Sequence, residues 1–128
     1  MQPYKLHFTI PGLPRTPNAL LGAHWKVRAG HAAKWKRLVF LAINNKQPKR
    51  PLVKAKLTLT RHSSGELDFA GLCGSFKAIE DALVMWGVIV DDCPDVVGRP
   101  EYLHVKAPRQ KGFIEVLVEE INKQTEAI

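Results

Sequence analysis

One segment of this chain alternates apolar and polar residues with a period of two, and this pattern constrains the fold more than any other feature. The apolar positions are Val53, Ala55, Leu57 and Leu59, and lysines and threonines lie between them. Because successive side chains of a strand point to opposite faces, residues 53–61 are predicted to form a strand with one buried face. Such a strand needs partner strands and a second layer that covers its apolar side.

Other segments of the sequence can supply the partner strands. Residues 4–10 alternate in the same way and are predicted to form a strand. Residues 102–106 and 113–120 are predicted to form a hairpin around a turn that contains a proline and a glycine. The short apolar run 88–90 is predicted to lie beside the 53–61 strand, joined to it through a helical crossover.

The covering layer is predicted from two segments that carry apolar residues at helical spacing. The first spans about residues 24–44, and its apolar stripe places Trp35 in the core. The second spans about residues 72–86 and is followed by Gly87, a residue type that commonly ends helices. The two helices are therefore expected to cover the apolar face of the sheet.

The element order predicts one small α/β (α+β) domain over residues 1–121, with a mixed sheet and two main helices, followed by a polar tail over residues 122–128. An apolar content of 45% in 128 residues suits one domain with a real core and excludes a disordered chain. No apolar run approaches the ~18 residues of a membrane span and no secretory signal is apparent, so a soluble cytoplasmic protein is expected. Cys73 and Cys93 match no metal-binding spacing and are expected to be free thiols.

Acidic residues lie at both ends of the second predicted helix, and a lysine lies between them. Asp68 precedes the helix, Lys77 is on it, and Asp91 and Asp92 follow the apolar run after it. Hydrolysis of a phosphodiester is helped by a metal-activated water, and Mg²⁺ prefers carboxylate ligands, so these residues are candidates for a metal site. Each has a structural alternative: Asp68 as a helix cap, Asp91 and Asp92 as a solvated turn, and Lys77 as an exposed helix residue.

These residues belong to a longer pattern that resembles the core of the RusA-type Holliday-junction resolvases, especially their phage-borne branch. In that family the pattern runs roughly Asp-x-Asp-Asn-Leu, a helix that carries Lys and Asp-Ala-Leu, then Gly-Val and Asp-Asp. The matching segments here are residues 67–72, 75–77, 81–83, 87–89 and 91–94. Segments nearer the N-terminus are also similar, namely residues 11–14, 17–18 and 24–36. The resemblance spans about residues 4–120, and its most specific part lies between Asp68 and Asp92.

The resemblance implies a RusA-like homodimer that cuts four-way DNA junctions in recombination and repair and requires Mg²⁺ or Mn²⁺. Its location would be the cytoplasm of a bacterium or of a phage-infected host cell. Asp68 matches the first aspartate of the family, and Asp92, with Asp91 beside it, matches the later metal-binding aspartate. Lys77 resembles the helix lysine that stabilises the phosphate, about one helical turn later than in the shortest members.

One position departs from the family pattern in a way that bears on catalysis. The second aspartate of Asp-x-Asp falls at position 70, where this chain has Ala70, and the following asparagine is Gly71. Engineered inactivation, natural degeneration, or replacement of the lost carboxylate by Glu66 would each account for this, and the first two are favoured. We expect the fold and DNA binding to survive while cleavage is weak or absent.

Basic side chains crowd the first predicted helix and the loops around it, where phosphate contacts would recognise branched DNA by shape and charge. The net charge of +7 favours such a polyanionic partner. The candidates for DNA contact are Arg15, Asn18, His24, Lys26, Arg28 and Lys34, and further arginines, including Arg61, lie in loops or at strand ends. A solvated basic helix face is the alternative. Two rival functions stay open: a non-catalytic module that binds branched DNA, and a basic structural protein without nucleic acid.

Overall fold

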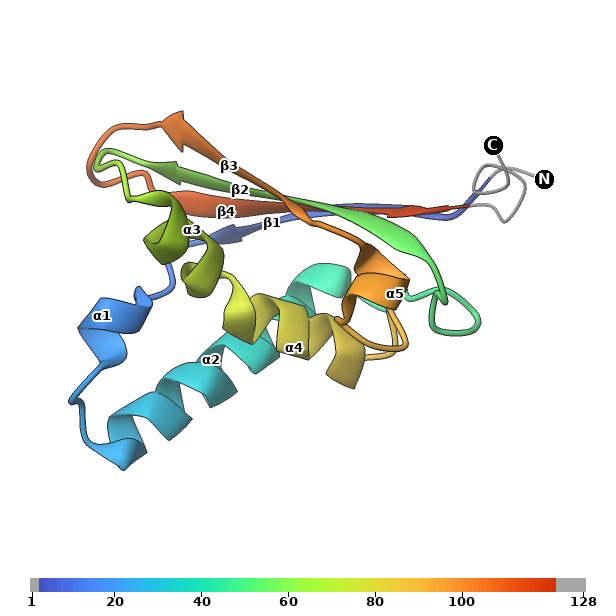
Figure 1. The fold of residues 1–128 in the computed structure, drawn as a ribbon, viewed down its shortest axis with the longest axis horizontal. Helices are drawn as coiled ribbons and strands as arrows, with labels where there is room; N and C mark the ends of the chain where they lie inside the picture. Colours follow the sequence, from blue (N-terminus) through green and yellow to red (C-terminus); the bar gives the residue numbers. More distant parts are fainter. Residues whose placement is uncertain (1–2, 122–128) are drawn as a thin grey trace.

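A four-stranded mixed sheet forms one layer of the protein, and the helices lie on one side of it (Figure 1). The computed structural model describes residues 3–121, so the predicted polar tail lies outside the described residues. The strands are β1 (Lys5–Pro11), β2 (Ala55–Ser63), β3 (Glu101–Lys106) and β4 (Phe113–Glu120), in the spatial order β1-β4-β2-β3. β4 is antiparallel to both of its neighbours, whereas β2 and β3 are parallel. The predicted small α+β domain with a mixed sheet is confirmed.

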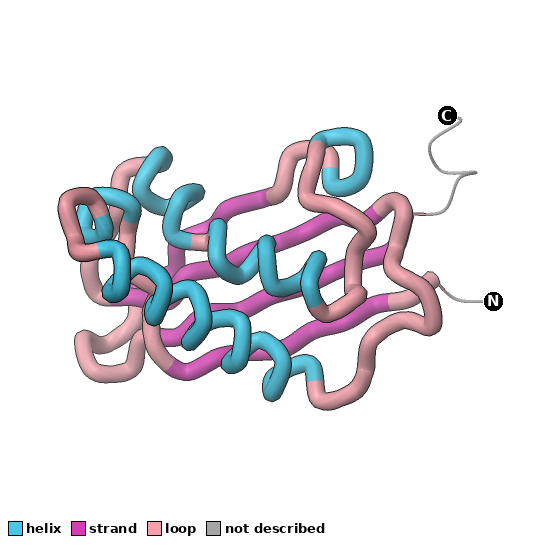
Figure 2. Tube along the Cα trace, turned by 90° about the horizontal axis from the view of Figure 1, so that it is seen from below, coloured by secondary structure: helices cyan, strands magenta, loops and turns pink. Residues whose placement is uncertain are grey.

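The helical layer consists of α1 (Pro17–Leu20), α2 (Trp25–Ile43), α3 (Phe69–Ser75), α4 (Lys77–Met85) and α5 (Pro94–Val97). Figure 2 shows α2 and the α3–α4 pair running across one face of the sheet. The short helices α1 and α5 each begin with a proline, whose missing N–H has no helical partner to lose. Between residues 3 and 121, no helix is long and apolar enough to cross a membrane.

The alternating segments form the predicted strands because one face of each is buried under the helices. In β2 the predicted apolar face is fully buried from Ala55 onward. The start of the predicted 53–61 strand is wrong, since Val53 is 57% exposed and Leu52 is buried instead. Leu52 forms an isolated parallel bridge with Ile89, so the predicted pairing of the 88–90 run with this segment is confirmed as a single bridge.

The predicted hairpin of the last two strands is wrong, although both strands form. β2 lies between β3 and β4, and β3 pairs with β2 in parallel, with Thr58 opposite Glu101. β4 already uses both of its edges for β1 and β2, so β3 does not pair with it and instead extends the free edge of β2. The connection over residues 107–112 is long enough to pass the end of β2, because neighbouring strands are only about 4.8 Å apart.

The first predicted helix is confirmed as α2. His24 caps its N-terminus, because its Nδ1 accepts a hydrogen bond of 3.2 Å from the Lys26 backbone N–H. Asn44 ends the helix in the left-handed conformation with a φ of 53°, which asparagine tolerates better than most residues. Trp35 is 2% exposed and packs in the core as predicted.

The second predicted helix is in fact two helices, α3 and α4, which meet at Phe76. The Phe76 backbone has φ −93° and ψ −2°, and its N–H donates to the carbonyls of Cys73 and Gly74. This tighter turn ends α3 and redirects the chain, while the fully buried Phe76 ring anchors the junction in the core. The apolar periodicity continued across the junction and so did not reveal the break. Cys73 and Cys93 are both free thiols, as expected.

The absence of a side chain at Gly74 lets α1 approach α3 closely. A Cβ atom at this position would lie 2.3 Å from the Pro17 Cγ, which is far inside van der Waals contact. α1, which carries Asn18, therefore packs against α3 and brings the preceding loop with Arg15 beside the α3–α4 junction. This contact places the predicted DNA-binding loop next to the predicted catalytic helix.

Candidate functional site

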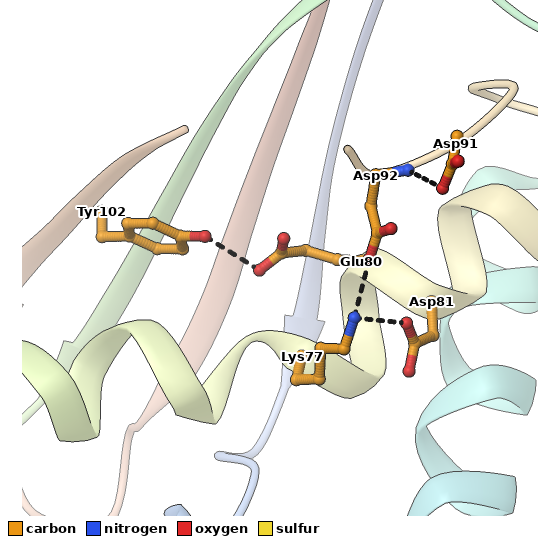
Figure 3. Close-up of polar contacts among 6 residues, drawn as sticks. All are labelled: Lys77, Glu80, Asp81, Asp91, Asp92 and Tyr102. Carbon is orange, nitrogen blue, oxygen red and sulfur yellow. Dashed lines mark hydrogen bonds and ion pairs between the residues drawn. The ribbon is translucent and has the colours of Figure 1, made fainter. Parts of the chain in front are cut away.

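Lys77 is the centre of a charged cluster at the start of α4 (Figure 3). Its Nζ donates a hydrogen bond of 2.8 Å to Asp92 Oδ2 and lies 3.1 Å from Asp81 Oδ1. Asp81 is one helical turn later on α4, whereas Asp92 comes from the loop after the Ile89 bridge. The cluster therefore joins two segments of chain, and it contains one more carboxylate than cation.

The position of Asp92 depends on a chain reversal at the end of α4. Gly87 has a φ of +80°, which allows the chain to turn back after the helix. The Leu52 N–H then donates to the Val88 carbonyl at 2.9 Å, and the Val90 N–H donates to the Leu52 carbonyl at 3.0 Å. These bonds hold the following loop against the segment before β2, so that Asp92 faces Lys77.

Asp91 takes part in the geometry of this loop and not in the ion pairs of Lys77. Its Oδ1 accepts a hydrogen bond of 2.7 Å from the Asp92 backbone N–H (Figure 3). This is a side-chain-to-backbone bond within a turn. The observed contact of Asp91 is therefore that of a turn residue, which was its structural alternative to a metal ligand.

The hydrogen bond between Lys77 and Asp92 favours the charged form of both groups. It is the main reason why the pKa of Asp92 is held below its usual value of 3.8. The bonds to Asp92 and then to Asp81 raise the pKa of Lys77 above its ordinary value, although burial opposes this. At neutral pH the pair is therefore fully ionised.

Glu80 and Tyr102 extend the cluster toward the sheet and were not singled out in the sequence. Glu80 is only 7% exposed, and its Oε1 accepts a hydrogen bond of 3.0 Å from the Tyr102 hydroxyl on β3. Burial is the main cause that raises the pKa of Glu80, and burial also raises the pKa of Tyr102. The sequence did contain a signal that could have identified Glu80. It is a glutamate on the apolar stripe of the helix, between Phe76 and Leu83 at helical spacing.

The substitution Glu80→Gln is expected to stabilise the protein at neutral pH by roughly 1 kcal/mol, because a buried carboxylate with one donor is poorly compensated. The pKa of Glu80 is raised above 4.5, so the folded state binds a proton more tightly than the unfolded state. Its contribution to stability is therefore present below the unfolded-state pKa and is lost as pH rises through the folded-state pKa. Urea denaturation of both proteins at about pH 4 and about pH 7 should show the gain only at the higher pH. Equal gains at both pH values would show that the charge of Glu80 is not the cause.

The cluster opens onto a cavity of about 610 Å³ between α1, α2 and the α3–α4 pair. One wall carries Lys77, Glu80, Asp81 and Tyr102, and the facing elements contribute Arg15, Arg28, His31 and Lys36. Cations and carboxylates therefore line the same space from different elements. Such an arrangement can attract a phosphate through the cations and present carboxylates to a bound cation.

A hydrogen bond fixes the basic loop to α2. The Arg15 backbone N–H donates to His31 Nε2 at 3.0 Å. Burial, followed by the charges of Arg15 and Lys34, lowers the pKa of His31, so this ring stays neutral and can accept the bond. The loop before α1 is thereby held at the edge of the cavity.

The residues predicted to contact DNA are exposed, and they lie on α1, on the first half of α2 and in the adjoining loops. Of these, Arg15 and Arg28 line the cavity. The others, exposed but outside the cavity lining, are Asn18, His24, Lys26 and Lys34. Arg61 does not belong to this surface, because it is 8% exposed and its Nη1 donates to the Pro14 carbonyl at 3.0 Å. It supports the proline-rich loop from inside.

Asp68 caps α3, as its structural alternative proposed. Its Oδ1 accepts a hydrogen bond of 2.9 Å from the Gly71 backbone N–H. Within residues 3–121, Asp68 forms no hydrogen bond or ion pair with Lys77 or Asp92. A Cβ at position 71 would lie 2.6 Å from this oxygen, so Gly71 leaves room for the capping conformation. Ala70 is exposed in the first turn of the same helix.

The carboxylates around Lys77 suit Mg²⁺ by ligand type. Across the described part of the chain, no group of three or more His, Cys, Asp or Glu side chains is arranged to hold a metal ion. Mg²⁺, however, is commonly held by one or two carboxylates together with substrate phosphates and water. Asp81 and Asp92, which both contact Lys77 Nζ, supply that number of ligands beside the cavity.

The charged cavity is thus built from segments that are distant in sequence, and its chemistry matches the residue types that the sequence pattern selected. No protein-family model and no curated protein matches this chain. A function for it therefore depends on the resemblance of its motifs and on the groups that line this cavity.

Proposed function

We propose that the protein is a Mg²⁺-dependent endonuclease of the RusA type that acts as a homodimer on four-way or other branched DNA. The observation that carries the proposal is the shared cavity, in which Lys77, bonded to Asp92 outside the lining, faces the same space as Arg15 and Arg28. The reaction in this proposal is the one that the motif resemblance implies, and the cavity is the proposed binding site of the phosphodiester.

The basic residues would bind the DNA backbone. Arg15, Arg28 and Lys36 line the cavity, and Lys26 and Lys34 continue the positive surface along α2. Such contacts recognise phosphates and carry little sequence information, so specificity would come from the geometry of the converging backbones. A dimer would present two such surfaces to the two cut strands of one junction.

Lys77 is suited to bind a phosphate oxygen at the site of cleavage. An ammonium group has three N–H donors, and two of them are directed at Asp92 and Asp81. The third can donate to a phosphate oxygen, where it would stabilise negative charge that develops in the transition state. Asp92 and Asp81 orient the ammonium group and keep it charged.

Asp81 and Asp92 would hold the metal ion in this proposal, and Asp68 would join them only if its carboxylate left the α3 cap. When bound, Mg²⁺ would supply a water of lowered pKa and neutralise charge on the phosphate. The chain's own residues would position the scissile phosphate against this pair and exclude bulk water from the cavity.

Ala70 and the capping role of Asp68 favour a second candidate, a module that binds branched DNA without cutting it. The Lys77 cluster lacks two carboxylates of the family pattern. Position 70 is Ala70, and the Asp68 carboxylate accepts a hydrogen bond from the Gly71 backbone N–H. The two candidates share the DNA surface and differ only in the chemical step.

Cleavage of a labelled four-way junction in Mg²⁺ or Mn²⁺ tests the proposal. The chain should bind the junction in preference to linear duplex and nick it slowly, and Ala70→Asp should accelerate paired nicking, because it restores a carboxylate that the family pattern contains. Binding is measured by gel shift, and cleavage on denaturing gels, with linear duplex as the control.

Each result of this experiment separates the candidates. If neither protein cuts but both prefer the junction, the non-catalytic module is correct. If neither protein prefers the junction over duplex, the protein is not a junction-specific DNA-binding protein, and both candidates fail.

A further inference from the structure

A second hollow, separate from the cavity beside α4, lies where β1 ends next to the start of β4. Its volume is about 800 Å³, and its walls come from the end of β1 and from the connection before β4. We call it the outer hollow, and it is lined by Thr9, Pro11, Gly12, Leu13, Arg109, Gln110, Lys111, Gly112 and Phe113. Arg109 and Lys111 are cations, and the lining that residues 3–121 provide includes no acidic side chain. The outer hollow therefore favours an anionic ligand.

One wall of the outer hollow is an aromatic ring in a fixed orientation. Phe113 lies on the face of the sheet opposite the buried Ile114. It stacks on its cross-strand partner His62, with ring centroids 4.0 Å apart and an interplanar angle of 8°. Glu115 holds His62 in turn, because its Oε1 bonds to His62 Nε2 at 2.9 Å. The orientation of the aromatic wall is thus set before a ligand arrives.

Backbone contacts fix the two sides of the outer hollow to each other. The Gly12 N–H donates to the Gly112 carbonyl at 3.0 Å, one step beyond the last β1–β4 pair, Pro11 and Phe113. A Cβ at position 112 would lie 2.7 Å from Leu13 Cδ1, so glycine at this position lets the two sides meet. The outer hollow is therefore part of the hydrogen-bonded end of the sheet.

The loop after β1 connects the outer hollow with the cavity beside α4. Figure 1 shows the chain running from the end of β1 to α1, and along it residues 11–13 line the outer hollow whereas Arg15 and Pro17 line the cavity. Arg61 lies beneath this loop, where it is 8% exposed and donates to the Pro14 carbonyl. Its buried Nε has no partner within residues 3–121. Because an arginine keeps its charge in proteins, positive charge continues under the loop from one site to the other.

We infer that the outer hollow binds an unpaired nucleotide of a single DNA strand, with the base against Phe113 and the phosphates beside Arg109 and Lys111. An aromatic surface next to a cationic groove is the combination with which proteins hold single strands without reading their sequence. A lone phosphate makes no use of an aromatic wall, and the carboxylates of an acidic peptide have no ring to stack on it. The positive path under the loop suits a polymer that reaches both sites. The inference goes beyond the proposed function, because it does not require the cavity beside α4 to cut DNA.

Fluorescence anisotropy of a labelled oligo(dT) of about twelve nucleotides tests the inference, since single-strand-binding domains cover strands of this length. Phe113→Leu keeps an apolar side chain but removes the ring. It should weaken binding about 5–150-fold, which corresponds to the loss of one stacked base. Phe40→Leu is the matched control and should leave the affinity unchanged, because Phe40 is 39% exposed, packs on Trp86 and lines neither site. Thermal melting shows whether each variant is folded.

An oligonucleotide of the same length that lacks the bases separates stacking from charge. It should bind the unmodified protein more weakly than oligo(dT) does, and Phe113→Leu should cause no further loss of its affinity. An equal effect of Phe113→Leu on both oligonucleotides would show that the ring acts only on the structure of the protein, and would overturn the inference.

The salt dependence of oligo(dT) binding tests the two cations, and it does so even if Phe113→Leu does not fold. Arg109→Gln and Lys111→Gln should each reduce the slope of log affinity against log salt concentration by about 0.7, the value for one phosphate contact with a single strand. Arg50→Gln removes the same charge from an exposed position before β2, outside both linings, and should leave the slope unchanged. Equal changes in all three variants would reflect net charge alone and would contradict the inference.

Two further results would refute a single-strand DNA site. One is the absence of oligo(dT) binding by the unmodified protein, and the other is tighter binding of oligo(rU), which would assign the outer hollow to RNA. Junction binding, measured in parallel, reports on the proposed function by itself. Preference for the junction without an effect of Phe113→Leu on oligo(dT) refutes only the inference. Oligo(dT) binding that depends on Phe113, without preference for the junction, refutes only the proposed function.

Discussion

Replacement of Lys77 by methionine is expected to reduce junction cleavage by about 10²–10³-fold, the range measured when one donor to a developing oxyanion is removed. The experiment uses the Ala70→Asp background, so that there is substantial cleavage to lose. Methionine keeps the length and apolar stem of lysine but cannot donate to a phosphate, to Asp92 or to Asp81. The rate of the single-turnover reaction at saturating protein separates this loss from weaker DNA binding.

The loss of Lys77 should also change the titration of its partner. The hydrogen bond from Lys77 is the main cause of the low pKa of Asp92, so that pKa should rise in the Lys77→Met protein, which carboxyl-carbon NMR can follow. Lys5→Met on β1 removes the same charge far from the cavity and serves as the control. Cleavage that is unchanged in Lys77→Met, or equally reduced in Lys5→Met, would refute a specific role for Lys77.

Replacement of Trp35 by alanine is expected to destabilise the protein by about 3–5 kcal/mol, the usual cost of removing a large aromatic side chain from a core. Trp35 lies on α2, is 2% exposed and belongs to the hydrophobic core. The lost stability combines the free energy of transferring the side chain out of water with the cost of the cavity that remains. It is a large fraction of the unfolding free energy of a typical domain, which is about 5–15 kcal/mol. Urea denaturation followed by circular dichroism measures it.

Leu41→Ala provides the comparison on the same helix. Leu41 is 64% exposed, and alanine is a good helix former, so the change should be within about 0.5 kcal/mol. Both variants should be compared at one protein concentration, because a dimer's stability depends on it. Similar losses at the two positions would show that α2 is not packed as described.

Sequence patterns predicted the elements well where the signal was local. The periods of two and of about 3.6 residues are properties of single segments, so β1, β2, β4 and α2 were found within a few residues of their bounds. The patterns failed where neighbours decided the outcome. The apolar stripe could not show that Phe76 divides the second helix, and it gave no hint that β3 would join β2 and not β4.

The candidate site shows the same division. The sequence selected Lys77 and Asp92, and the structure joins them in one ion pair. It also selected Asp68, whose carboxylate bonds to its own helix end, because a side-chain acceptor at an N-cap meets unpaired backbone N–H groups nearby. Glu80 was missed, since a charged residue on an apolar stripe has no evident partner until β3 places Tyr102 opposite it.

The sequence by itself determined the four strand segments and the α2 segment to within a few residues, the basic character of α2, and the residue types available for phosphate chemistry. Only the tertiary structure decided which carboxylates meet Lys77 and which cations face them. The physical reason is that periodicity and capping act over a few residues, whereas the cavity depends on the turn at Gly87, the Leu52–Ile89 bridge and the contact of α1 with Gly74. The turn, the bridge and the helix contact together bring side by side segments that are far apart along the chain.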